Sequence, residues 1–236
     1  MELFPDATVR LSGARYAPAE TDFLWTGWIG AGAGLFRVNG VTGWGMAEVE
    51  TILGDTLRPF EANQANYHLQ LGFRRTVGRV EVEPFFHHVS RHYVDRPKTQ
   101  AVDWNVLGFR GAMRFEPGGR PVRVEAGLGR TTQASLPGYQ WEATAAVAIA
   151  AREGDGASPY ARASARYVTV RDLDTPETLQ RGAFLDRAAE AGVRFSRGGR
   201  ALELFAAGER RNDVFLEEPG ALTRALFGLR ILARTR

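Results

Sequence analysis

Apolar and polar residues alternate with period two over long segments of this chain, and this pattern limits its fold more than any other feature. Leu69, Leu71 and Phe73 fall on one face of an extended strand, whereas Gln70 and Arg74 fall on the other. The alternating segments are about ten to fifteen residues long, against the five or six that are usual in globular strands. About twelve of them follow one another along the sequence. The chain is therefore predicted to be all-β.

The connections between these segments alternate between short and long. Asn39-Gly40 and Gly198-Gly199 are typical of tight hairpins, whereas 53–64 and 172–182 are longer and polar. This alternation is typical of outer-membrane barrels, which have short periplasmic turns and longer outer loops. We predict one domain over residues 1–236, a closed antiparallel transmembrane β-barrel of about 12 strands in a bacterial outer membrane. The signal peptide is expected to be absent from the sequence.

The charge content agrees with a barrel better than with helices that span a membrane. Charged residues make up 24% of the chain, and the longest uncharged stretch, 23–36, is shorter than the ~18 residues that a spanning helix needs. In a barrel, alternate positions carry charges into the interior while the others meet lipid. Buried Arg and Glu on neighbouring strands are then expected to pair. The net charge of +3 does not indicate a nucleic-acid partner, and the absence of cysteine excludes a thiol nucleophile.

Aromatic residues fall near both predicted ends of the strands, as expected for the two membrane interfaces. The predicted outer belt contains Trp25, Tyr67, Tyr139 and Trp141. The predicted inner belt contains Phe73, Phe115 and Phe195.

Three of the four histidines lie in the segment 86–95, at the outer-loop end of a predicted strand. His88, Ser90 and His92 share the lipid-facing phase of that strand. The next strand runs back antiparallel, and its lipid-facing phase carries Asn105 and Asp103. If the connection between the two strands is centred near Arg96 or Pro97, His88 lies opposite Asn105 and Ser90 opposite Asp103, about 5 Å apart across the strands.

This grouping has the composition of a serine hydrolase site. A serine hydroxyl is a weak nucleophile until a base takes its proton, and the base works better when a third group fixes its tautomer. Ser90 is the candidate nucleophile and His88 the candidate base, with Asn105 or Asp103 orienting His88. Polar residues on a lipid-facing wall are costly, which indicates a functional reason for them.

The same residues carry a family resemblance. His88-Val89-Ser90, followed by Asp103 or Asn105 on the next strand, resembles the His-x-Ser plus Asn or Glu arrangement of outer-membrane phospholipase A and of the outer-membrane lipid A deacylase. The string 88–95 is also similar to the His-x-Ser-Ser-His-x-x-Asp run of an uncharacterised outer-membrane barrel family. The resemblance to the two enzyme families implies a barrel that hydrolyses acyl esters of membrane lipids from its outer surface.

Other functions remain open on the sequence alone. A non-catalytic structural or lipid-binding barrel and a narrow small-solute channel are the alternatives to an enzyme. Anionic lipid phosphates could be recognised, with or without catalysis, by His92, Arg91, Arg96 and Lys98. The expected partners are membrane lipids and lipopolysaccharide, with the chain a monomer or a weak homodimer.

No cofactor is assigned by the sequence. His88 and His92 are too far apart along an extended strand to chelate one metal ion easily. Calcium stays open because hard cations prefer oxygen ligands and the predicted outer loops carry carboxylates. These carboxylates are Asp22, Asp55, Glu61 and Asp95.

Overall fold

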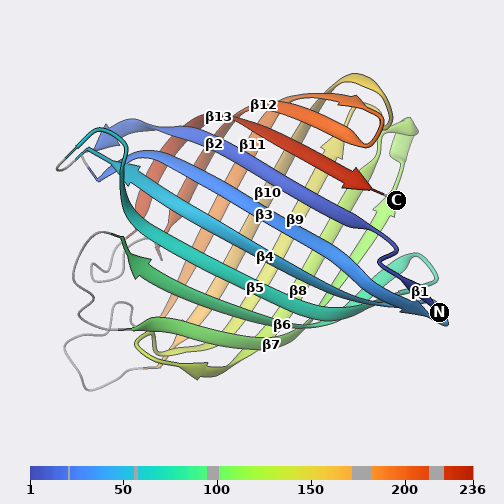
Figure 1. Ribbon diagram of the computed structural model, residues 1–236, viewed down its shortest axis with the longest axis horizontal. Helices are drawn as coiled ribbons and strands as arrows, with labels where there is room; N and C mark the ends of the chain where they lie inside the picture. The colour runs from blue at the N-terminus through green and yellow to red at the C-terminus, as the bar shows by residue number, and fades with distance from the viewer. Residues whose placement is uncertain (21, 56–57, 95–100, 172–181, 213–220, 236) are drawn as a thin grey trace.

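The computed structural model is a single closed antiparallel β-barrel (Figure 1). It describes residues 1–20, 22–55, 58–94, 101–171, 182–212 and 221–235. The described elements are β1 (Glu2–Leu3), β2 (Ala7–Glu20), β3 (Phe23–Val38), β4 (Val41–Gly54), β5 (Glu61–Val77), β6 (Val80–Tyr93), β7 (Val102–Phe115), a short 3-10 turn (Pro117–Gly119), β8 (Val122–Ala134), β9 (Tyr139–Ala150), β10 (Gly156–Val170), β11 (Ala183–Arg197), β12 (Arg200–Arg211) and β13 (Leu222–Thr235).

Every long strand pairs with its neighbours in sequence, and the pairing of β13 with β2 closes the barrel. The short strand β1 pairs with the end of β3 through Glu2 and Leu3 and adds a thirteenth strand to the twelve that form the wall. The two chain ends lie at the end of the barrel that carries the tight turns (Figure 1). By the rule for outer-membrane barrels, this is the periplasmic end. The predicted fold class is confirmed.

The outer wall is apolar, as the alternation predicts. Leu69, Leu71 and Phe73 in β5 are each 44–53% exposed, and Phe109 in β7 is 67% exposed. In a closed barrel, the backbone N–H and C=O groups of every strand are paired with neighbouring strands, so only side chains face the lipid. Among the described residues, no helix is long and apolar enough to cross a membrane.

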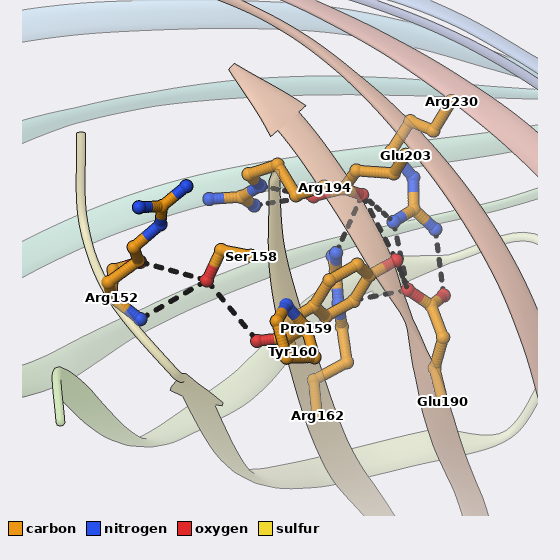
Figure 2. Close-up of polar contacts among 9 residues, drawn as sticks. All are labelled: Arg152, Ser158, Pro159, Tyr160, Arg162, Glu190, Arg194, Glu203 and Arg230. Carbon is orange, nitrogen blue, oxygen red and sulfur yellow. Dashed lines mark hydrogen bonds and ion pairs between the residues drawn. The ribbon is translucent and has the colours of Figure 1, made fainter. Parts of the chain in front are cut away.

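The interior holds paired charges. The fully buried Glu203 carboxylate accepts hydrogen bonds from Arg162, Arg194 and Arg230, with N–O distances of 2.6–2.7 Å (Figure 2). Glu190 accepts from Arg230 and from the hydroxyl of Tyr160 in the same cluster. A charge taken out of water needs partners of this kind, so facing strands supply each other's counterions. The predicted pairing of inward Arg and Glu is confirmed here.

Apolar side chains fill the interior at two places near the long-loop end. One cluster includes Trp104, Tyr139 and Phe184, and the other includes Tyr16 and Phe23. The prediction that Tyr139 belongs to the outer aromatic belt is therefore wrong. A β-bulge pairs Val170 with Tyr139 but Thr169 with Trp141, which leaves Trp141 exposed on the wall and turns Tyr139 inward.

Candidate active site on the outer wall

The histidine-rich segment lies on the lipid-facing wall of β6. Its phase is that of Val80 and Val82, which are 39% and 38% exposed. The register of β6 with β7 places His88 opposite Asn105 and Ser90 opposite Asp103, as expected for a connection centred near residues 96 and 97. The long connection between β6 and β7 puts this group at the loop end of the barrel, opposite the chain termini (Figure 1).

A chain of hydrogen bonds crosses the wall from β6 to β8. The Nδ1 atom of His88 lies 2.7 Å from Oδ1 of Asn105, and Nδ2 of Asn105 donates to Oε1 of Gln133 at 3.0 Å. An amide oxygen can only accept, so the His88 ring donates its proton from Nδ1. Its Nε2 atom then carries the lone pair. This is the tautomer that a general base needs.

The Ser90 hydroxyl contacts the other outer histidine. Nε2 of His92 lies 3.3 Å from Oγ of Ser90, and the ring of Tyr67 meets the His92 ring edge-on at 5.4 Å between centroids. Two residues that are two apart in a strand are about 7 Å apart. The two outer histidines therefore flank Ser90 on the same face of β6.

Asp103 takes a different partner from the one that an orienting role would require. Its carboxylate accepts a hydrogen bond from the Ser135 hydroxyl, and its backbone carbonyl accepts from the Ser135 amide. Of the two candidates for the third residue, Asn105 is the one that contacts His88.

The predicted lipid-binding arginine lies on the opposite face of the strand. Arg91 is buried in the inner phase, with its guanidinium over the Trp104 ring at 5.1 Å. The alternation itself places Arg91 there, because it is one residue out of phase with Ser90. Arg96 and Lys98 lie outside the described residues.

Sequence reasoning missed the contribution of β8. Thr132 forms a β-bulge, so that Gln133 pairs with Asn105 whereas Thr131 pairs with Val106. The extra residue changes the phase of the strand and brings Gln133 and Ser135 to the outer wall. Arg130 is also exposed on this wall, with its guanidinium 5.8 Å from the Trp141 ring centroid.

Solved structures share this architecture. LpxR from Salmonella typhimurium superposes with a TM-score of 0.56 at 11% identity, over 96% of this chain and 99% of that chain. Outer membrane phospholipase A from Escherichia coli gives 0.56 at 14% identity, over 96% and 92%. The Salmonella typhi phospholipase dimer with bound calcium gives 0.55 at 14%, over 96% and 90%. No protein-family model matches the sequence, and no curated protein does.

The chain is an outer-membrane β-barrel. The closed wall with its exposed apolar band and the superpositions agree on this point, and the resemblance expected from the sequence is confirmed at the level of the fold. Because the sequence identities are only 11–14%, the superpositions show a shared fold and do not show a shared function.

The described part of the barrel contains no cluster of metal-ligating side chains. Within those ranges, no group of three or more His, Asp or Glu side chains is placed to hold an ion. Asp22, Asp55 and Glu61 belong to these ranges, whereas Asp95 lies outside them.

The remaining histidines of the barrel face the interior. Nδ1 of His68 lies 3.2 Å from Nε2 of His87, and the His68 ring stacks on Trp28 at 5.4 Å. Both histidines line an interior cavity of about 270 Å³ together with Arg211 and Glu142. The barrel wall separates this pair from Ser90, so it takes no part in the outer group.

Proposed function

We propose that this barrel is an acyl-ester hydrolase that acts on phospholipid or lipid A from its outer wall. The observation that carries the proposal is the hydrogen bond between His88 and Asn105, which fixes a base-competent imidazole two residues from Ser90 on the lipid-facing side of β6. These three side chains have the roles of nucleophile, base and orienting group.

The proposed reaction proceeds through an acyl-enzyme. The Ser90 Oγ attacks the carbonyl carbon of the ester, and His88 Nε2 takes the hydroxyl proton. The bond between the carbonyl carbon and the alcohol oxygen then breaks, and His88 returns its proton to that oxygen. Water attacks the acyl-serine with His88 again as the base, which releases the fatty acid and restores Ser90.

Ser90 must turn for this reaction. In the structure its hydroxyl contacts His92, and no hydrogen bond joins it to His88. A serine hydroxyl changes its partner by rotation about one side-chain bond, and catalytic hydrogen bonds are often incomplete before substrate binds. We assign His92 to holding the resting hydroxyl and His88 to catalysis.

The surroundings favour a lipid substrate over a solute. Ser90 and His88 face the bilayer, where the acyl chains of outer-leaflet lipids bring their ester groups close to the interface. The interior contains paired charges such as Glu50 with Arg211 at 2.7 Å, and apolar clusters fill it near the outer end. These features argue against a wide aqueous channel.

The direct test is release of fatty acid by purified, refolded protein in detergent, with phospholipid and lipopolysaccharide as substrates. Wild-type protein is expected to release fatty acid, and Ser90→Ala and His88→Ala are each expected to lower the rate by about 10³-fold or more. Ser164→Ala is the matched control, because Ser164 faces the interior cavities. Heat-modifiable gel migration checks folding. Activity that survives in both site variants contradicts the proposal.

A further inference from the structure

Two arginines face each other on the lipid-facing wall, away from the histidine group. Arg187 in β11 and Arg210 in β12 are register partners, and both are exposed. Their phase is that of Leu185 and Leu204, which are 45% and 51% exposed. Directly opposed side chains have Cβ atoms about 5 Å apart. Two guanidinium groups therefore emerge side by side toward the bilayer, near the long-loop ends of these strands.

The described part of the barrel supplies no counterion to this pair. Among the described residues, the interior arginines find carboxylates, as Arg194 and Arg230 do at Glu203, whereas no ion pair includes Arg187 or Arg210. Like charges placed directly opposite destabilise a sheet, and an arginine on the lipid face of a barrel adds a cost that rises with depth. An anion from outside the chain would offset both effects.

An apolar groove begins next to the arginines. The following outward-facing pairs toward the tight-turn end are Ala189 with Gly208 and Ala191 with Ala206. They line a recess of about 530 Å³ on the outer wall, together with Val147 and Ile149 of β9. A Cβ atom added to Gly208 would meet no atom within 4 Å, so the groove is open at that point.

We propose that the outer wall of β9 to β12 binds one lipid of the outer leaflet that has a phosphate group and a net negative charge. The lipid phosphate lies between Arg187 and Arg210, and an acyl chain lies in the groove below. Guanidinium groups suit phosphate because their planar donors bind its oxygens in pairs. The small side chains of the groove let the acyl chain approach the wall closely. This site is separate from the histidine group on β6 to β8 and does not depend on hydrolysis.

Native mass spectrometry of the detergent-solubilised protein tests this site with phosphatidylglycerol, phosphatidylcholine and inorganic phosphate as probes. We expect one phosphatidylglycerol to bind wild-type protein at least tenfold more tightly than phosphatidylcholine. The double variant Arg187→Gln/Arg210→Gln is expected to lose this preference. The matched control is Arg197→Gln/Arg200→Gln, which removes another exposed pair of register partners, at the tight turn and outside the groove. This control variant is expected to bind phosphatidylglycerol as tightly as the wild-type protein does.

Two further experiments distinguish a specific lipid site from nonspecific binding of anions. Gly208→Leu keeps both arginines but fills the groove, and it is expected to weaken phosphatidylglycerol binding by about tenfold while leaving the protein folded. Inorganic phosphate at millimolar concentration is expected not to displace the lipid. Equal loss in the two arginine double variants would overturn the proposal, and so would unchanged binding in Gly208→Leu or displacement by phosphate alone. Arg187→Lys/Arg210→Lys keeps the charges but not the planar donors, so it is expected to bind phosphatidylglycerol more tightly than the glutamine double variant and less tightly than wild type. Partial binding of this kind excludes loss through misfolding.

Discussion

The imidazole of His88 and the amide of Asn105 are joined by a 2.7 Å contact across β6 and β7, on a wall that carries a band of exposed apolar side chains. The contact fixes two properties of the histidine. It holds the ring in one orientation, and it places the ring proton on Nδ1 because the amide oxygen accepts. Gln133 continues the chain by accepting from the Asn105 amide nitrogen.

Removal of the Asn105 side chain should slow catalysis without unfolding the barrel. Asn105→Ala leaves His88 free to rotate and to take the other tautomer, so we expect kcat for fatty acid release to fall by roughly 10²-fold with a small change in KM. Asn105→Asp keeps an acceptor for Nδ1 and should retain more of the activity. Gln133→Ala removes only the outer member of the chain and serves as the control. An Asn105→Ala variant with wild-type kcat would exclude the orienting role.

Substitution of His88 and substitution of His92 should affect the rate of ester hydrolysis to different extents. His88→Ala removes the proposed base, whereas His92→Ala removes only the resting partner of the Ser90 hydroxyl. We expect the first variant to lose about 10³-fold or more in kcat and the second less than about tenfold. Single-turnover kinetics with a chromogenic acyl ester would measure both. The reverse order of effects would assign the base to His92.

Glu203 should be a major contributor to the stability of the barrel. Its carboxylate is fully buried among three arginines. Glu203→Gln leaves Glu190 as the carboxylate that pairs with Arg162 and Arg230, and it removes the carboxylate partner of Arg194. We expect the free energy of unfolding to fall by roughly 3–5 kcal/mol, measured by urea titration of tryptophan fluorescence in lipid vesicles. Glu2 also pairs with an arginine, Arg37 at 3.0 Å, but its side chain is 55% exposed. Glu2→Gln should therefore cost about 1 kcal/mol or less. Equal costs for the two variants would contradict the account.

The sequence predicts the wall of this barrel well because period-two alternation acts over whole strands. The same rule places His88, Ser90, Asn105 and Asp103 on one face of β6 and β7. A connection centred near residues 96 and 97 adds the register, and so the facing pairs His88 with Asn105 and Ser90 with Asp103. It also places Arg91 inside, although the residue type had suggested a lipid contact. In these cases, the position along the strand decides the environment of the side chain.

Bulges account for what the sequence did not reveal. One extra residue near Thr132 turns Gln133 and Ser135 outward, and another near Gln140 turns Tyr139 inward. A bulge changes the phase of every residue beyond it, and its position depends on strand pairing that no local pattern records. The choice between Asn105 and Asp103 at His88 likewise depends on side-chain contacts, since Asp103 bonds to Ser135 instead.

Activation of Ser90 by His88 is tested by covalent labelling of the refolded barrel with a long-chain alkyl fluorophosphonate, followed by peptide mass spectrometry. Such a probe reacts with an activated serine and not with ordinary hydroxyl groups. We expect one adduct per chain, located on Ser90, with labelling lost in His88→Ala and strongly reduced in Asn105→Ala. An unlabelled Ser90 in a folded barrel that releases fatty acid, or an adduct on a different serine, would contradict the activation of Ser90 by His88.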